Sequence, residues 1–199
     1  KLIGFDRLDA VILTHLHSDH ISDMHVLKYA VQIKSKRGTM DHQIKVYAPP
    51  EPKEEYKRLD AKDAFILNPI TEDTALRIGD MKISFSLTKH PFMNFAVAIE
   101  CEEKRFVYSG DTAWTDSIVR FAKGADLLML DAGLLKRDYS EGAPHLTAEQ
   151  CGIVASEAGA GKLILTHLWP EYDTADLLEE ARAGFANTEV AQILQDYDI

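Results

Sequence analysis

The chain has 199 residues, and 22 lysine and arginine residues against 32 aspartate and glutamate residues give it a formal net charge of −10. Its hydrophobic fraction of 46% and charged fraction of 27% are those of a folded globular domain, which excludes a disordered chain. The longest apolar run has five residues, whereas a membrane-spanning helix needs roughly 20, so no membrane span is expected. The acidic balance disfavours long nucleic acids as partners, because their binding relies on basic surfaces.

Two features bear on the cellular compartment. Residues 1–10 lack the basic start and the apolar stretch of a signal peptide. The two cysteines, Cys101 and Cys151, are too few for a disulfide framework. We therefore expect a cytoplasmic protein.

Strand and helix signals alternate along the first third of the chain. The aliphatic run Leu8–Thr14 predicts a buried strand, and apolar residues at helical spacing in Ile21–Lys34 predict a helix. The polar segment His15–His20 is therefore a loop that joins a strand to a helix. Three further elements follow: a strand over Ile44–Ala48, a short helix over Glu54–Ala61 and a strand over Ala64–Leu67.

The middle of the chain predicts three adjacent antiparallel strands, over Met81–Thr88, Phe95–Cys101 and Arg105–Ser109, with a hairpin turn at Glu102–Lys104. Helices and strands then alternate to the C-terminus, which favours an α/β fold with helices outside the sheet. These last elements are helices over Asp116–Ala122, Thr147–Ala158 and Ala175–Phe185, and strands over Leu127–Leu130, Leu163–Thr166 and Glu189–Leu194.

The segment His15-Leu16-His17-Ser18-Asp19-His20 places three imidazoles and one carboxylate at the end of a predicted strand, where α/β sheets hold their sites. Residues 15 and 17 project to the same side of an extended chain, so both rings can reach one metal ion. Asp19 and His20, where the chain turns into the helix, can serve a second ion. The alternative is an exposed polar turn in which Asp19 caps the helix, and it fits less well because histidine is a rare residue.

Further ligands are required, because zinc prefers about four and a catalytic site keeps one position for water. Three residues follow predicted strands elsewhere in the chain, namely His90, Asp111 and His167. Each has an ordinary alternative, since a Gly-Asp pair after a strand is often a turn and a single histidine is often structural. Their shared position at strand ends favours a common metal site.

Two more residues are candidates for roles beside the metal ligands. His145 precedes a predicted helix, and its alternative is capping or plain exposure. Asp131 ends the strand over Leu127–Leu130 and can orient a histidine, although a turn carboxylate is an equal alternative. His25 and His42 are expected on the surface.

These motifs together resemble the metallo-β-lactamase-fold hydrolases. The segments His145-Leu-Thr-Ala and Lys162-Leu-Ile-Leu-Thr-His167 are similar to the ribonuclease Z-like and phosphodiesterase-like branch of that superfamily. The resemblance implies one domain over residues 1–199, with an αββα sandwich of two mixed sheets and helices outside. The metal ligands that it implies are His15, His17 and His90 on one ion, Asp19, His20 and His167 on the other, and Asp111 as the bridge. It also implies that His145 contacts the scissile phosphate.

Two features depart from this family. Family members begin with a β-rich segment before the HxHxDH strand, so we expect the usual N-terminal strands to be absent, cleaved off or supplied by another chain. A homodimer or a complementing N-terminal fragment is therefore an expected type of partner. The long glycine- and proline-rich arm that grips transfer RNA in ribonuclease Z is also missing, which disfavours pre-tRNA processing.

The expected cofactors are two divalent metal ions, with zinc favoured and manganese or iron acceptable to the same ligands. Two ions, the carboxylates of Asp19 and Asp111 and a bridging hydroxide leave a formal charge of about +1, which suits a small anionic substrate. We predict hydrolysis of a small or cyclic nucleotide-type phosphodiester through a metal-bridging hydroxide, with Asp19 and His145 as catalytic residues. Two alternatives stay open: hydrolysis of a thioester, lactone or β-lactam on the same metals, and a catalytically inactive metal-binding fragment or module.

Overall fold

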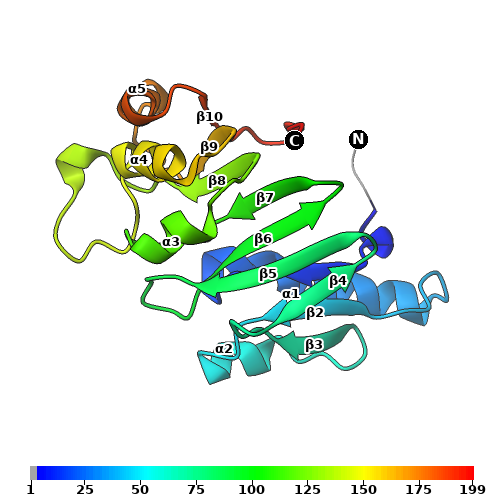
Figure 1. Ribbon diagram of the computed structural model, residues 1–199. Coiled ribbons are helices and arrows are strands. Elements are labelled where there is room, and N and C mark those ends of the chain that lie inside the picture. Colours follow the sequence, from blue (N-terminus) through cyan, green and yellow to red (C-terminus); the bar gives the residue numbers. More distant parts are fainter. Residues whose placement is uncertain (1–3) are drawn as a thin grey trace. The chain divides into compact units, whose positions relative to one another are not determined.

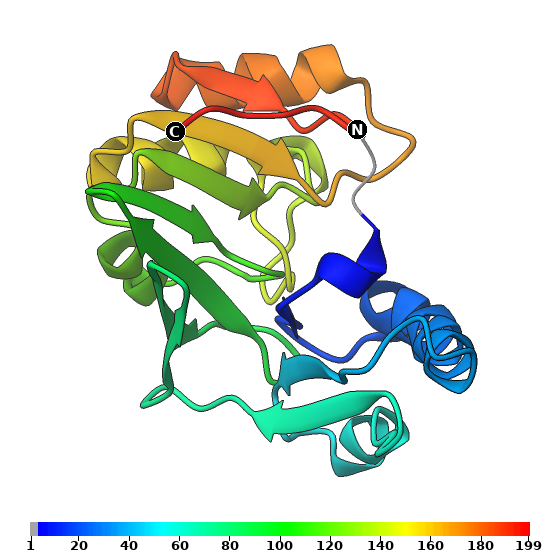
Figure 2. The same ribbon diagram turned by 90° about the vertical axis from the view of Figure 1, so that its right-hand side faces the viewer.

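The computed structural model describes residues 4–199 (Figures 1 and 2). These residues belong to two compact units of the chain, Lys1–Thr71 and Glu72–Ile199. Each unit contains a β-sheet and helices, so the predicted α/β class with two sheets is confirmed. The prediction of a single domain over residues 1–199 stays a prediction. Among the described residues, no helix is both long and apolar enough to cross a membrane.

The first unit holds a three-stranded parallel sheet in the order β1-β2-β3. Its strands are β1 (Ala10–Ile12), β2 (Ile44–Ala48) and β3 (Phe65–Pro69), and its helices are η1 (Phe5–Arg7), α1 (Ser18–Lys36) and α2 (Lys53–Arg58). Parallel strands need crossover connections, and α1 and α2 lie in those connections. The strand β1 is shorter than the predicted Leu8–Thr14, because only three of its residues pair in register with β2.

The second unit holds a seven-stranded mixed sheet in the order β10-β9-β8-β7-β6-β5-β4. Its strands are β4 (Ala75–Ile78), β5 (Met81–Leu87), β6 (Phe95–Cys101), β7 (Lys104–Tyr108), β8 (Leu127–Asp131), β9 (Lys162–Thr166) and β10 (Thr188–Val190). The predicted antiparallel series is confirmed as β5, β6 and β7. The sequence prediction missed β4, and it placed the last strand too far toward the C-terminus, because pairing with β9 ends at Val190.

The direction of the strands in this sheet decides where its loops gather. The strand β6 is antiparallel to both β5 and β7, so β5 points the same way as β7. The strands β8 and β9 are parallel to β7 and to each other. The C-terminal ends of β5, β7, β8 and β9 therefore meet at one edge of the sheet, where α/β proteins place their functional loops.

Helices cover one face of the seven-stranded sheet (Figure 1). They are α3 (Asp116–Phe121), α4 (Ala148–Ala158) and α5 (Thr174–Gly184), and a short 3₁₀ turn, η2 (Lys136–Asp138), precedes α4. The predicted start of α4 is confirmed, because Thr147 caps it in a reciprocal pair of hydrogen bonds with Gln150. At Gly152 a Cβ atom would lie 2.3 Å from the carbonyl oxygen of Ala181, so only glycine allows α4 and α5 to approach this closely.

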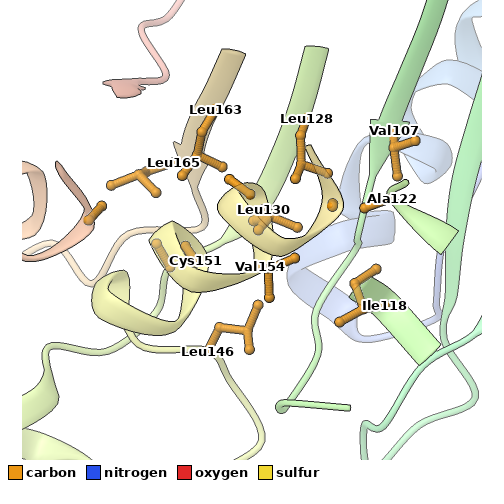
Figure 3. Packing of buried hydrophobic residues seen from close by; sticks show 14 of the residues in the cluster. Val107, Ile118, Ala122, Leu128, Leu130, Leu146, Cys151, Val154, Leu163 and Leu165 are labelled. Carbon is orange, nitrogen blue, oxygen red and sulfur yellow. The ribbon is translucent and has the colours of Figure 1, made fainter. Parts of the chain in front are cut away.

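The core of the second unit lies between these helices and the sheet (Figure 3). Leu128 and Leu130 of β8 and Leu163 of β9 are fully buried, as is Val154 of α4. Full burial of each such side chain contributes about 1.5–3 kcal/mol relative to exposure. This packing fixes the C-terminal ends of both strands. The end of β8 carries Asp131, and the end of β9 leads into His167.

Candidate metal centre

Four residues of the first unit, His15, His17, Asp19 and His20, form what we call the N-terminal group. His15 and His17 follow β1 on extended backbone, and Nε2 of His15 lies 3.1 Å from Nδ1 of His17. The ring centroids of His15 and His20 are 4.2 Å apart. His15 is fully buried, and its Nδ1 lies 3.2 Å from Oγ1 of Thr14. The prediction that both side chains project to the same side of the chain is therefore confirmed.

Asp19 and His20 lie in the first turn of α1, whose N-cap position is His17. The helix therefore begins inside the motif, and Asp19 does not occupy the capping position that the alternative interpretation gave it. Oδ2 of Asp19 lies 3.3 Å from Nε2 of His20, and the Asp19 side chain is 72% exposed. This carboxylate is therefore open to solvent.

Four residues of the second unit, His90, Asp111, His145 and His167, form what we call the C-terminal group. Asp111, His145 and His167 each offer one ligand atom, and these atoms all lie within 4.8 Å of one another. Oδ2 of Asp111 is 3.3 Å from Nε2 of His167. The ring of His145 stacks on that of His167 with centroids 4.9 Å apart, and the ring centroid of His90 lies 5.6 Å from that of His145. The structure thus brings together the residues that follow β5, β7 and β9.

The backbone of His167 adopts a left-handed conformation, with φ of 55°. Such a conformation costs a non-glycine residue on the order of 1–3 kcal/mol, and it persists only where the surrounding structure imposes it. Here the strand β9 has just ended, and the turn places the imidazole beside Asp111. Strain of this kind is common at functional sites.

Asp131 is fully buried at the end of β8 and contacts two histidines of the C-terminal group. Its Oδ2 accepts hydrogen bonds from the backbone N–H of Thr112 and from Nδ1 of His145, at 3.0 and 2.8 Å. Its Oδ1 accepts one from the backbone N–H of Gly133 at 3.0 Å and lies 3.3 Å from Nδ1 of His167. A carboxylate at Nδ1 fixes the tautomer of a metal-binding histidine and leaves its Nε2 for the site, which is the role that the sequence suggested for Asp131.

The same contact changes the proton affinity of His145. The hydrogen bond from its Nδ1 to Asp131 raises the pKa of His145, against the opposing effect of partial burial. The charged imidazolium is therefore favoured at this position. A protonated imidazole donates hydrogen bonds from both ring nitrogens, so the raised pKa favours a donor role for His145.

The donor sets of both groups fit divalent metal ions. In a tetrahedral zinc site with bonds of about 2.0–2.1 Å, two ligand atoms lie about 3.3 Å apart. The pair His15 and His17 is separated by 3.1 Å, and the pair Asp111 and His167 by 3.3 Å. Imidazole nitrogen and carboxylate oxygen are also the ligand types that zinc, manganese and iron accept.

Two residues that support the C-terminal group were missed in the sequence. Asn94 is fully buried and hydrogen-bonds to the loop that carries Asp111, and Gly133 lies against His145. An asparagine or a glycine in a loop is an ordinary turn residue, so neither gave a signal. His25 and His42 are exposed, as predicted.

The basic pair Lys136 and Arg137 forms ion pairs with carboxylates that are not part of the candidate metal centre. Nζ of Lys136 lies 2.7 Å from Glu149, and Nη1 of Arg137 lies 3.0 Å from Asp176. Both side chains are exposed and lie in ion pairs on the surface.

Comparison with known proteins places these residues in a family context. Residues 1–168 match the model of the β-lactamase superfamily domain, and this span contains every predicted metal ligand. The probable metallo-hydrolase YhfI of Bacillus subtilis is 34% identical over 193 residues, which are 96% of this chain and 79% of that protein. A ribonuclease Z of Brevibacillus brevis is 24% identical over 253 residues, covering 94% of this chain and 79% of that protein.

Solved structures agree with the sequence comparison. The crystal structure of the metallo-β-lactamase fold protein YhfI from Bacillus subtilis has a TM-score of 0.90 and 32% sequence identity, over 94% of this chain and 76% of that one. A human short-form tRNase Z has a TM-score of 0.69 and 17% identity, over 96% of this chain and 79% of that one. At 17% identity, the similarity to the human tRNase Z supports the fold alone.

Proposed function

Because this chain belongs to the metallo-β-lactamase superfamily of metal-dependent hydrolases, we propose that it is a phosphodiesterase acting on a small or cyclic nucleotide. The predicted family, its fold and the class of hydrolase are confirmed by the comparisons. The substrate, the number of metal ions and the role of each residue belong to the proposal.

We propose that the N-terminal and C-terminal groups together hold two divalent metal ions. Each group by itself offers four side chains, which are too few for two zinc ions that each prefer about four donors. The assignment follows the family resemblance: His15, His17 and His90 hold one ion, Asp19, His20 and His167 hold the other, and Asp111 bridges them. Zinc is the favoured metal for these donors, and manganese or iron are the alternatives.

When bound, divalent metal ions supply Lewis acidity and lower the pKa of a bound water to about 7. Side chains of this protein carry out the proton transfers. The exposed carboxylate of Asp19 accepts the proton of the attacking water and passes it to solvent. Nε2 of His145 donates a hydrogen bond or a proton to the phosphate or to the leaving oxygen, while Asp131 at Nδ1 stabilises the protonated imidazole before it donates.

The observation that carries this proposal is the pair formed by His145 and the buried Asp131. Nδ1 of His145 is hydrogen-bonded to Asp131 beside Asp111 and His167, and this bond raises the pKa of His145, which favours the form whose Nε2 can donate to a tetrahedral anion. Such a donor suits a phosphodiester better than the neutral carbonyl of a thioester, lactone or β-lactam.

Three observations favour a small substrate over a long nucleic acid. The chain carries a formal charge of −10. The basic pair Lys136 and Arg137 is already engaged in ion pairs. The alignment with the Brevibacillus ribonuclease Z extends over 253 residues, more than the 199 of this chain, so that relative carries segments that this chain lacks.

The test is turnover of bis(p-nitrophenyl) phosphate, cyclic nucleotides, a thioester, a lactone and a β-lactam by the zinc- or manganese-loaded protein. We expect phosphodiester cleavage to dominate, and His145→Ala to lower its kcat by about 10²–10⁴-fold. The matched control is His25→Ala, which removes an exposed histidine of α1 and leaves turnover unchanged. Faster turnover of the carbonyl substrates, or an unaffected His145→Ala variant, would refute the phosphodiesterase assignment.

A further inference from the structure

We infer that Asn94 and Thr88 form a clamp that positions Asp111 for metal binding, by tying its loop to the loop that carries His90. This inference rests on the proposed function, since it takes Asp111 and His90 as metal ligands. Both loops lie in the second unit, after β5 and β7, so the clamp acts within one part of the fold.

The centre of the clamp is the side-chain amide of Asn94, a fully buried residue just before β6. Its Nδ2 donates to the backbone carbonyl oxygen of Asp111 at 2.8 Å and to that of Ser109 at 3.3 Å. The residue between these two, Gly110, has φ of 58°, a left-handed conformation that glycine adopts without strain. The amide therefore holds the backbone on both sides of this flexible glycine, and it thereby fixes the backbone position of Asp111.

Thr88 completes the clamp from the end of β5. Nδ2 of Asn94 lies 2.5 Å from Oγ1 of Thr88, and the same Oγ1 lies 3.2 Å from the carbonyl oxygen of Asp111. The backbone N–H of Thr88 donates to the carbonyl oxygen of Asn94 at 2.9 Å, which closes the loop that contains His90. The side chains of Asn94 and Thr88 thus hold both the loop that contains His90 and the loop that contains Asp111.

Only certain residues can fill these two positions. A backbone carbonyl oxygen accepts hydrogen bonds and never donates, so the group at position 94 must be a donor. Asparagine meets this requirement, whereas the isosteric aspartate carries two acceptor oxygens and would face the carbonyl oxygens of Ser109 and Asp111 without a proton to share. At position 88 serine retains the hydroxyl, and valine retains the shape without it.

The experiment compares Asn94→Asp, Thr88→Val and Thr88→Ser with the wild-type full-length chain. The matched control is Asn187→Ala, because Nδ2 of Asn187 also donates to a backbone carbonyl, that of Gly161, but on an exposed surface remote from these loops in the sequence. Zinc affinity is measured by competition with a chelating dye. The visible absorption spectrum of the cobalt-substituted protein reports the geometry around the metal.

We expect Asn94→Asp and Thr88→Val to weaken the affinity for zinc by about 10–100-fold and to shift the cobalt spectrum. Thr88→Ser should restore both properties, and Asn187→Ala should change neither. If Asn94→Asp does not fold, the comparison of Thr88→Val with Thr88→Ser tests the inference. Variants with a lower urea midpoint but wild-type zinc affinity and spectrum would show a merely structural role and overturn the inference. Wild-type protein that binds no metal would instead overturn the proposed function, and this inference with it.

Discussion

The N-terminal and C-terminal groups contain similar side chains but are assembled in different ways. His15, His17, Asp19 and His20 come from one short segment that runs from the end of β1 into the first turn of α1, whereas His90, Asp111, His145 and His167 come from separate loops of the second unit. The carboxylates differ as well: Asp19 is 72% exposed beside His20, whereas Asp111 of the C-terminal group and its neighbour Asp131, which supports His145, are buried. The short sequence spacing of its residues is enough to bring the N-terminal group together, whereas the C-terminal group depends on packing and on buried hydrogen bonds.

This difference predicts that the C-terminal group is the more sensitive to substitutions outside its own ligands. An exposed ion pair contributes little, about 0–1 kcal/mol. A buried carboxylate with several donors costs far more to disrupt, because its partners lose their hydrogen bonds in a dry environment.

The largest effect is expected for Asp111→Ala. Asp111 is buried and its Oδ2 lies 3.3 Å from Nε2 of His167. Its removal should lower the metal content by about one ion per chain and reduce phosphodiester turnover by more than the 10–100-fold that is typical of residues that only orient ligands. Elemental analysis of the purified variant checks this, with Asp176→Ala, an exposed carboxylate, as control. Unchanged metal content would remove Asp111 from the metal site.

Asp131→Asn should have the next largest effect. The amide cannot supply the negative charge that raises the pKa of His145, so we expect kcat or metal affinity to fall by about 10–100-fold. The protonated form of His145 then persists over a narrower range, and the alkaline limb of the kcat profile should move to lower pH. A pH–rate profile measures this shift, and a profile that coincides with wild type would contradict the role of the pair.

The pair also makes stability depend on pH, with a sign that follows from the raised pKa. Its contribution is fully present below the pKa of an unfolded histidine, about 6.5, and is lost as the pH rises through the higher pKa of folded His145. We therefore expect the urea midpoints of unfolding of wild type and Asp131→Asn to differ most at acidic pH. The difference that comes from this pair should vanish at alkaline pH.

The smallest of these effects is expected for Gly133→Ala. A Cβ atom at this position would lie 3.1 Å from Oδ1 of Asp131 and 3.1 Å from both Cβ and Cγ of His145, so His145 must shift by a few tenths of an ångström. We expect kcat to fall about tenfold, less than the roughly 10²-fold cost of a 1 Å misplacement. Steady-state kinetics measure it, with Lys136→Ala as an exposed control that should leave kcat unchanged.

The sequence predicted the N-terminal group well because its signal is local. The spacing of His15 and His17 on extended backbone is enough to place both rings on one side. The strand ends of the C-terminal group were also predictable, since β5, β7, β8 and β9 each read clearly as strands. That they meet at one edge follows from the sheet order, which no local pattern contains.

Other features could not be read from the sequence for physical reasons. The strand β4 is a short edge strand that pairs only with β5 in the described sheet, so its burial pattern is weak. The role of Asn94 depends on carbonyl groups 15 and 17 residues away in the chain. Gly133 is needed because of the proximity of His145, a contact that exists only after α4 has packed on the sheet.

The central claim is that both groups serve one hydrolytic site with two metal ions. The most direct test is to titrate the metal-free full-length chain with zinc and to follow bis(p-nitrophenyl) phosphate turnover at each addition. We predict that turnover rises until about two equivalents per chain are bound and then reaches a plateau, as a two-metal mechanism requires. A plateau at one equivalent, or no turnover at any loading, would contradict the claim.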